Sequence, residues 1–155
     1  MKTFNQLVSE GLENVDELFP WDLSEALASA NTPLLLDIRE ADEFEAMHIK
    51  DSINIPRGIL ESACEFGYAE TEPRLASARN HNIVVICRSG NRSVLATLTL
   101  NILGFQNVKS LKTGLRGWND DERALHDQQG NAVDIDAADK FFSPEISAEQ
   151  MAESP

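Results

Sequence analysis

The apolar positions of this chain recur at two spacings, which together predict helices alternating with strands. Helical spacing near the start predicts an amphipathic helix over residues 3–18, formed by Phe4, Leu7, Val8, Leu12, Val15 and Leu18. Short apolar runs predict strands at residues 34–38, 52–56, 83–87 and 107–111. Helical patterns are expected at residues 20–30, 39–49, 57–66, 72–80 and 92–103. This alternation favours an α/β fold with a parallel sheet that is buried on both faces.

Glycine, proline and polar segments mark the remaining boundaries. The stretch "TGLRGW", residues 113–118, predicts a glycine-marked loop. A turn signal at residues 129–131 predicts a small hairpin, followed by a last helix. Beyond Pro144 the sequence is polar, and we expect it to be frayed or disordered. We therefore expect an N-terminal helix in 1–19, a central domain in 20–118 and an acidic extension in 119–155.

Charge is distributed unevenly, and this narrows the classes of partner. The 155 residues carry a net charge of −13. Residues 1–33 hold one Lys/Arg against six Asp/Glu, residues 34–118 hold ten of each, and residues 119–155 hold two against ten. Nucleic-acid binding would need a basic surface, so this pattern argues against it. The acidic ends are consistent with a solvated surface, and a basic partner is the alternative.

The remaining composition places the chain in a reducing compartment. No apolar run reaches the roughly 18 residues of a membrane span, and the acidic start lacks the features of a secretory signal. Cys64 and Cys87 are the only cysteines, so no disulfide framework is implied. We therefore expect a cytoplasmic protein without a membrane partner. The cysteines and three histidines show no zinc spacing, and we expect neither a metal nor a cofactor.

The segment after the strand at 83–87 carries the candidate chemistry. It consists of Cys87, Arg88, Ser89, Gly90, Asn91, Arg92 and Ser93. Small residues and a glycine let the backbone curl so that several N–H groups point inward, and the following helix adds its free N–H groups and positive dipole end. Such surroundings lower the pKa of a thiol from about 8.5 by a unit or more. The loop therefore predicts a nucleophilic Cys87 thiolate suited to an anionic electrophile.

The two cysteines have different alternatives. An isolated cysteine that ends an apolar strand is most often a buried small hydrophobe, but the loop behind Cys87 favours a reactive thiol. Cys64 lies in a predicted helix without such surroundings. A core or surface thiol is the favoured interpretation of Cys64, and a resolving partner for Cys87 is the alternative.

Three separated motifs together resemble the rhodanese family in its single-domain form, over about residues 20–118. They are "LLLDIREADEFEAMHIKDSINIPRG", the cysteine loop within "IVVICRSGNRSVLATLTLNILGF", and the closing "GLRGW". Met47 replaces a glycine that is common in the family before His48, and Lys112-Thr113-Gly114 stands where the family commonly has a glycine pair. Both departures lie outside the loop. The resemblance implies a three-layer α/β/α rhodanese-like fold with about five parallel strands.

The same resemblance implies sulfur transfer through a persulfide on Cys87. The donor would be a small sulfane anion such as thiosulfate, and the acceptor a thiol or a sulfur-carrier protein. The amides of residues 88–93 would hold the persulfide, while Arg88 and Arg92 would recognise the anionic part of the donor. Asp37 and Arg39 would form a structural ion pair, and His48 a structural hydrogen bond.

Two alternatives remain at this point. A persulfide relay or interaction module would need the same loop, so sequence alone does not separate it from an enzyme. A phosphatase or arsenate reductase of the same fold would have five residues between the cysteine and the arginine, whereas Arg92 follows Cys87 after four. The shorter loop favours a sulfur atom over a tetrahedral oxyanion. Oligomeric state cannot be inferred from the sequence.

Overall fold

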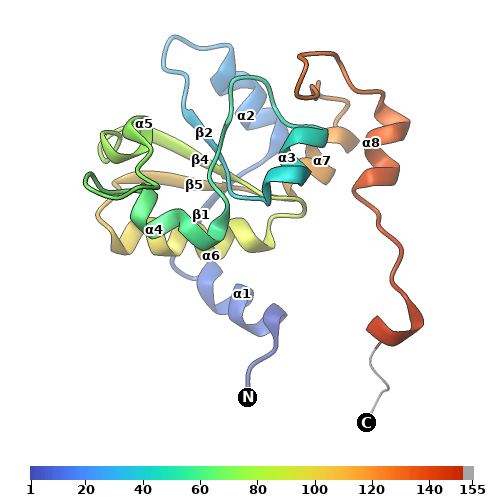
Figure 1. The fold of residues 1–155 in the computed structure, drawn as a ribbon, viewed down its shortest axis with the longest axis horizontal. Helices are drawn as coiled ribbons and strands as arrows, with labels where there is room; N and C mark the ends of the chain where they lie inside the picture. The colour runs from blue at the N-terminus through green and yellow to red at the C-terminus, as the bar shows by residue number, and fades with distance from the viewer. Residues whose placement is uncertain (152–155) are drawn as a thin grey trace.

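The computed structural model describes residues 1–151 and has a five-stranded, all-parallel sheet at its centre (Figure 1). The strand order is β1-β5-β4-β2-β3. The strands are β1 (Asp16–Leu18), β2 (Leu34–Asp37), β3 (Ile53–Asn54), β4 (Asn82–Ile86) and β5 (Asn107–Leu111). The helices are α1 (Phe4–Leu12), α2 (Pro20–Leu27), α3 (Ala41–Ala46), α4 (Leu60–Ala63), α5 (Pro73–Ala76), α6 (Asn91–Ile102), α7 (Gly114–Asp120) and α8 (Ile135–Phe141). The predicted α/β class and number of strands are confirmed.

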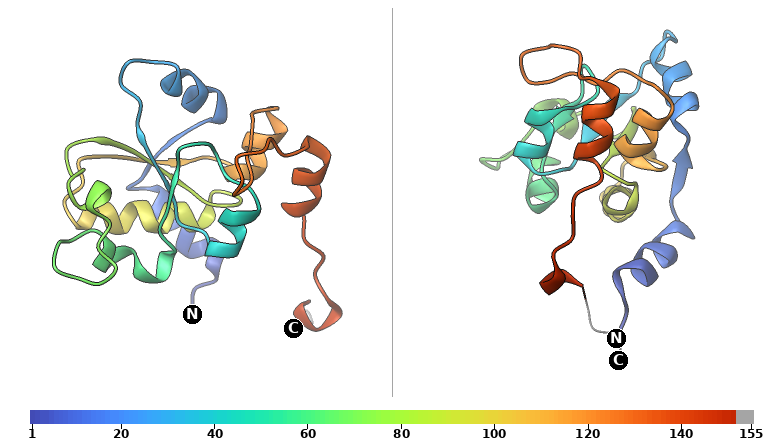
Figure 2. Two further views of the ribbon diagram at one scale, coloured as in Figure 1. Left: turned by 45° about the horizontal axis from the view of Figure 1, so that its top comes forward. Right: turned by 90° about the vertical axis from the view of Figure 1, so that its right-hand side faces the viewer.

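Helices cover both faces of the sheet, which gives three layers (Figures 1 and 2). Strand β4 shows why: Ile83 and Val85 pack with residues of α4, α5 and α6, whereas Val84 and Ile86 pack with residues of α2, α7 and α8. Its run of β-branched residues fits a strand buried on both sides. Helix α1 forms a smaller third cluster against α6.

The predicted helix over residues 3–18 is wrong in its second half. Helix α1 ends at Leu12, and residues Asp16–Leu18 form β1, which pairs in parallel with β5. Gly11 packs against Val94 of α6 at a distance that leaves little room for a side chain. The open edge of β5 then offers backbone hydrogen bonds to the following segment, and these outweigh the weak helical periodicity of so short a stretch.

The predicted loop at residues 113–118 is also wrong, because Gly114–Asp120 form helix α7. The helices expected at 57–66 and 72–80 are shorter than predicted. The first is a 3-10 turn at Arg57–Ile59 followed by α4, and the second is α5 alone. The remaining boundaries shift by a few residues, as is usual for helix ends that fray.

The C-terminal segment combines confirmed and unpredicted features. The predicted turn is present, with His126 bridged to Ala132 and Gly130 at a φ of +83°. The last helix is α8, and its Phe142 end is buried against α7. Beyond Pro144, where disorder was predicted, the chain is exposed with one 3-10 turn at Ala148–Gln150. The rest of that prediction, residues 152–155, lies outside the described residues.

Within residues 1–151, none of the helices has both the length and the apolar character that a bilayer crossing requires.

Candidate active site

Cys87 lies at the carboxyl end of β4, directly before the loop that leads into α6, with 1% of its surface exposed. Its Sγ accepts hydrogen bonds from the backbone N–H groups of Gly90, at 3.1 Å, and Ser93, at 3.3 Å. These amides are free because Gly90 is the N-cap of α6 and Ser93 lies in its first turn, where the carbonyl four residues earlier lies outside the helix. The sulfur therefore lies among donors at the positive end of the α6 dipole.

The hydroxyl groups of Ser93 and Ser110 form a short chain of polar contacts that begins at the sulfur of Cys87. The Sγ and Oγ atoms of Cys87 and Ser93 are 3.3 Å apart, and Ser93 Oγ lies 2.7 Å from Ser110 Oγ of β5. Both serines are fully buried. Each hydroxyl thus has its partner inside the protein, as buried polar groups require.

The start of helix α7 holds the backbone of the cysteine loop in place. The N–H groups of Leu115 and Arg116, in the first turn of α7, donate to the carbonyls of Cys87 and Arg88, both at 2.9 Å. Gly114 makes this approach feasible, since an added Cβ would lie 2.5 Å from the Cys87 carbonyl oxygen. Gly90 faces the same loop with a φ of +89°. The conformation around Cys87 therefore depends on α7 as well as on α6.

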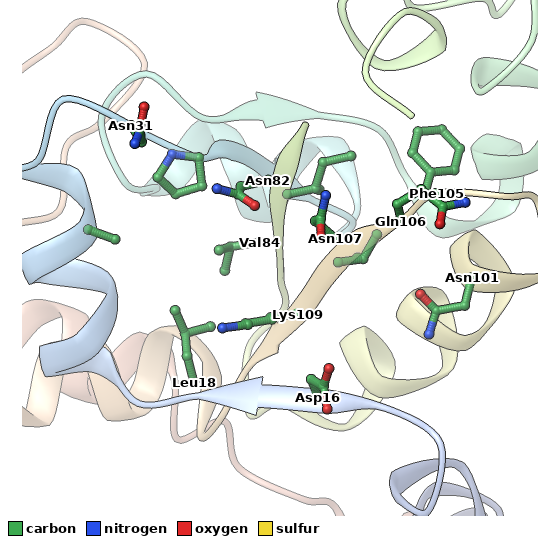
Figure 3. A pocket seen from close by; sticks show the side chains of 14 residues that line it. Asp16, Leu18, Asn31, Asn82, Val84, Asn101, Phe105, Gln106, Asn107 and Lys109 are labelled. Atoms are coloured by element: carbon green, nitrogen blue, oxygen red, sulfur yellow. The ribbon is translucent and has the colours of Figure 1, made fainter. Parts of the chain in front are cut away.

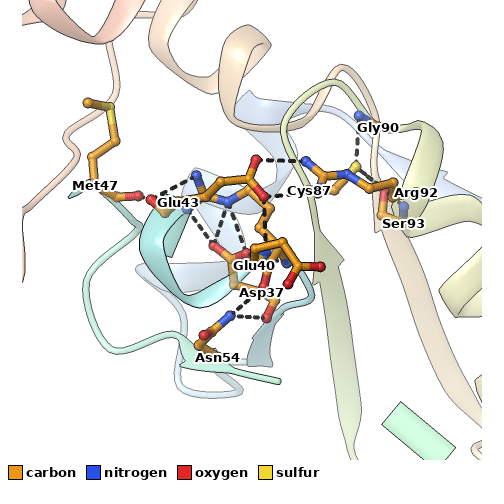
Figure 4. A network of polar contacts seen from close by, with 10 residues as sticks. Asp37, Glu40, Glu43, Met47, Asn54, Cys87, Gly90, Arg92 and Ser93 are labelled. Carbon is orange, nitrogen blue, oxygen red and sulfur yellow. Dashed lines mark hydrogen bonds and ion pairs between the residues drawn. The ribbon is translucent and has the colours of Figure 1, made fainter. Parts of the chain in front are cut away.

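Arg92 is engaged by an acid from another element. Its two terminal nitrogens donate to the two carboxylate oxygens of Glu43 on α3, each at 3.0 Å (Figure 4). Partial burial acts to raise the pKa of Glu43. The hydrogen bonds from Arg92 and from the Glu40 amide, with the charges of Arg92 and Arg39, outweigh burial and hold that pKa below its usual range. The same pairing, opposed by burial, raises the pKa of Arg92. Both groups are charged at neutral pH.

The buried pair Asp37–Arg39 holds α3 in place. Arg39 Nη2 donates to Asp37 Oδ2 at 2.9 Å and to the Met47 carbonyl at 2.7 Å, while Nη1 donates to the Glu43 carbonyl at 3.3 Å. Neither charged side chain is exposed. The guanidinium nitrogens of Arg39 are thus used by Asp37 and by two backbone carbonyls. This is the geometry of the structural ion pair that was expected. His48 Nδ1 similarly lies 2.7 Å from the Phe44 carbonyl.

The other loop residues remain available at the surface. Arg88 and Asn91 are half-buried, and Ser89 is exposed. Among the described residues, Arg88 makes no ion pair, in contrast to Arg92. Cys64 is fully buried in the apolar core, and burial raises the pKa of its thiol to about 11, with Arg79 only partly opposing this. A thiol that stays protonated at neutral pH is a poor resolving nucleophile.

Two hollows differ in their relation to Cys87. One of about 510 Å³ borders the loop and is lined in part by Phe19, Trp21, Ser89 and Arg116. The rings of Phe19 and Trp21 stack at 4.6 Å, and both are substantially exposed. The other hollow, of about 540 Å³, lies over β1, β5 and the start of β4 (Figure 3). Because Cys87 follows the opposite end of β4, only the first hollow can serve it.

Sequence reasoning identified the contiguous loop but missed its partners from elsewhere. Glu43 lies 49 residues from Arg92, and Ser110 lies 17 residues from Ser93. Two features of the sequence could have indicated these partners. They are the acidic helical segment that contains Glu43 and the two glycines of "TGLRGW", where α7 begins.

Comparison with known proteins shows the family of this chain. A family model described as "Rhodanese-like domain" matches residues 20–121. The chain is 32% identical over 103 residues to the "Putative thiosulfate sulfurtransferase, mitochondrial" of Schizosaccharomyces pombe, spanning 64% of this chain and 72% of that protein. It is also 32% identical over 112 residues to the "Putative sulfur carrier protein YrkF" of Bacillus subtilis, spanning 71% of this chain but only 54% of that one.

Solved structures show the same fold. A human single-domain sulfurtransferase is 25% identical, with a TM-score of 0.61 over 69% of this chain and 97% of its own. A Rhodopseudomonas palustris protein of unknown function, described as a possible tyrosine phosphatase, is 23% identical, with a TM-score of 0.71 over 79% of this chain and 93% of its own. The latter likeness concerns the fold alone. With the family model covering most of the chain, this protein belongs to the rhodanese-like domain family.

Proposed function

We propose that this chain is a sulfurtransferase that carries sulfane sulfur as a persulfide on Cys87. The single observation that carries the proposal is the position of Cys87 Sγ, which accepts two backbone N–H groups at the start of α6. Preorganised amide donors stabilise a thiolate before attack and a persulfide anion after it. Sulfurtransferases and a sulfur carrier among the relatives support a role in sulfur transfer.

The proposed reaction begins with attack of the Cys87 thiolate on the outer sulfur of a sulfane donor such as thiosulfate. A new S–S bond forms at Sγ, the S–S bond of the donor breaks, and sulfite leaves with the bonding electron pair. The three negative charges of thiolate and thiosulfate become those of persulfide and sulfite. Arg88 is suited to hold the departing sulfite, because it directly follows Cys87 in the loop and forms no ion pair within residues 1–151.

Transfer to the acceptor completes the cycle. An acceptor thiolate attacks the outer sulfur of the persulfide, and Cys87 leaves as a thiolate. The hollow beside Ser89, with the exposed Phe19 and Trp21 rings, offers space for a thiol or a sulfur-carrier protein. Both cysteines are free and buried, which suits a reducing compartment such as the cytoplasm.

A persulfide relay is the second candidate, since a sulfur carrier occurs among the relatives. The relay predicts slow turnover, a stable persulfide and tight binding to one protein partner. Phosphoryl transfer is disfavoured by the loop, because Arg92 comes one residue too early and is already paired with Glu43. If the protein hydrolysed an aryl phosphate faster than it turned over thiosulfate, phosphoryl transfer would be favoured over sulfur transfer.

The test measures persulfide formation and turnover together. Intact-protein mass spectrometry after thiosulfate treatment is expected to show an increase of about 32 daltons that a thiol reductant removes. Cys87→Ser should abolish both this increase and thiocyanate formation from thiosulfate and cyanide, because a hydroxyl is a far weaker nucleophile. Its circular dichroism should remain that of the wild type. Turnover by folded Cys87→Ser protein would exclude the proposal.

A further inference from the structure

The charge balance around Cys87 is set by an acid outside the loop. The paired groups are half-buried, with side-chain exposures of 33% for Arg92 and 24% for Glu43. Glu43 is itself fixed, because its Oε2 accepts the Glu40 amide at 3.0 Å and its carbonyl accepts Arg39 Nη1. The carboxylate is therefore a built part of the site, and rotation away from Arg92 would break several contacts.

This pairing leaves the loop with less free positive charge than its sequence suggests. Asp37 compensates Arg39, and Glu43 compensates Arg92, so Arg88 is the one loop arginine without an ion-pair partner among the described residues. A thiolate that meets thiosulfate brings three negative charges together. A monoanionic donor brings two, which a single free arginine and the helix dipole can better accommodate.

We infer that Glu43 is a specificity-determining residue that withholds Arg92 from the donor and tunes the site toward monoanionic sulfane donors over dianionic ones. The inference rests on the proposed sulfur transfer and adds the charge class of its donor. A thiosulfonate is the matched monoanion, since it carries the same outer sulfur on a sulfonyl group. Attack by Cys87 forms the same Sγ–S bond, and a sulfinate leaves with the electron pair.

The experiment compares thiosulfate with methanethiosulfonate as donors to Cys87. Glu43→Gln removes the negative charge while keeping the shape, which frees the Arg92 charge for the donor. We expect the ratio of kcat/KM for thiosulfate to that for methanethiosulfonate to rise roughly fivefold or more. Glu45→Gln is the matched control, because Glu45 is an exposed acid on the same helix, and the ratio should stay within about twofold of the wild type.

A second variant and a second measurement keep the inference testable if Glu43→Gln is unstable. Arg92→Gln leaves Glu43 uncompensated and should shift the ratio in the opposite direction. Alkylation of Cys87 by iodoacetate and iodoacetamide tests the same charge without sulfur transfer: the rate ratio of the anionic to the neutral reagent should rise in Glu43→Gln and fall in Arg92→Gln.

The outcomes distinguish failure of the proposed sulfur transfer from failure of the role assigned to Glu43. If the wild type accepts sulfur from neither donor, the proposed function fails, and the alkylation ratios still decide the role of Glu43. If both donors react but neither ratio responds to Glu43→Gln, or both change in the reverse direction, the role assigned to Glu43 is overturned. A uniform loss with all reagents would assign Glu43 a purely structural role, and this too contradicts the inference.

Discussion

At the scale of single residues, two buried cysteines differ because of the groups around them. Cys64 and Cys87 both contribute to the same apolar cluster, and neither is appreciably exposed. Cys87 receives two backbone N–H groups, whereas burial raises the pKa of Cys64 to about 11. A thiol that is protonated at neutral pH packs as a small hydrophobe. Local donors, and not burial, therefore distinguish the candidate nucleophile from the core thiol.

Replacement of Cys64 tests this distinction. Cys64→Ala removes a buried sulfur and should lower the free energy of unfolding by about 1–2 kcal/mol, measured by denaturant titration. Turnover of thiosulfate per folded molecule should stay at the wild-type level, because Cys64 has no part in the reaction. A folded variant that stalls after persulfide formation would instead identify Cys64 as a resolving thiol.

At the scale of elements, the parts that could be predicted are those with a strong local pattern. Strand β4, helix α6 and the loop between them follow from one contiguous stretch of apolar residues, small residues and glycine. Strand β1 and helix α7 could not be predicted, because each exists through contacts with distant segments. β1 pairs with β5, and the first turn of α7 donates to the Cys87 and Arg88 carbonyls. For the same reason the loop residues were identified, while Glu43 and Ser110 were missed.

The contact between α7 and the cysteine loop can be tested at one glycine. In Gly114→Ala, the new Cβ would lie within 2.6 Å of backbone atoms of Cys87 and Arg88, at a φ of +60°. Gly130→Ala is the control, because its φ of +83° also lies in the left-handed region while nothing lies within 4 Å of an added Cβ. We expect Gly130→Ala to cost about 1 kcal/mol.

Gly114→Ala should cost at least about 2 kcal/mol more, since backbone atoms must move. It should also slow alkylation of Cys87, because the loop that presents the sulfur is displaced. Thermal unfolding and the alkylation rate measure the two effects. Equal stability of the two variants would mean that α7 does not constrain the cysteine loop.

At the scale of the whole molecule, the segment predicted as an acidic extension packs onto the rest of the protein as far as Phe142. Ala138 of α8 and Phe142, the residue that follows this helix, join the apolar cluster that includes Leu115 and Trp118 of α7. The Asn119 side-chain amide donates to the Ile135 carbonyl at 3.1 Å. The acids between residues 119 and 151 lie mostly at the surface. The extension thus combines a solvated outer face with an apolar inner face, and α7 connects that inner face to the loop of Cys87.

The adjacent phenylalanines at the C-terminal end of α8 distinguish this arrangement from a loosely attached tail. Phe142 is 2% exposed and Phe141 is 38% exposed, although both are the same residue type on neighbouring positions. Phe142→Ala should lower the free energy of unfolding by about 3–5 kcal/mol through loss of apolar contacts and the cavity left behind. Phe141→Ala should lower it by less than about 1 kcal/mol.

The buried Trp118 of α7 reports the transition by fluorescence, and exposed Trp21 reports it from α2. Because α8 packs within the same apolar cluster as α2 and α7, both signals should move together to lower denaturant in Phe142→Ala. A separate early transition confined to the C-terminal segment, with the Trp118 midpoint unchanged, would show that the extension unfolds independently of the domain that holds Cys87.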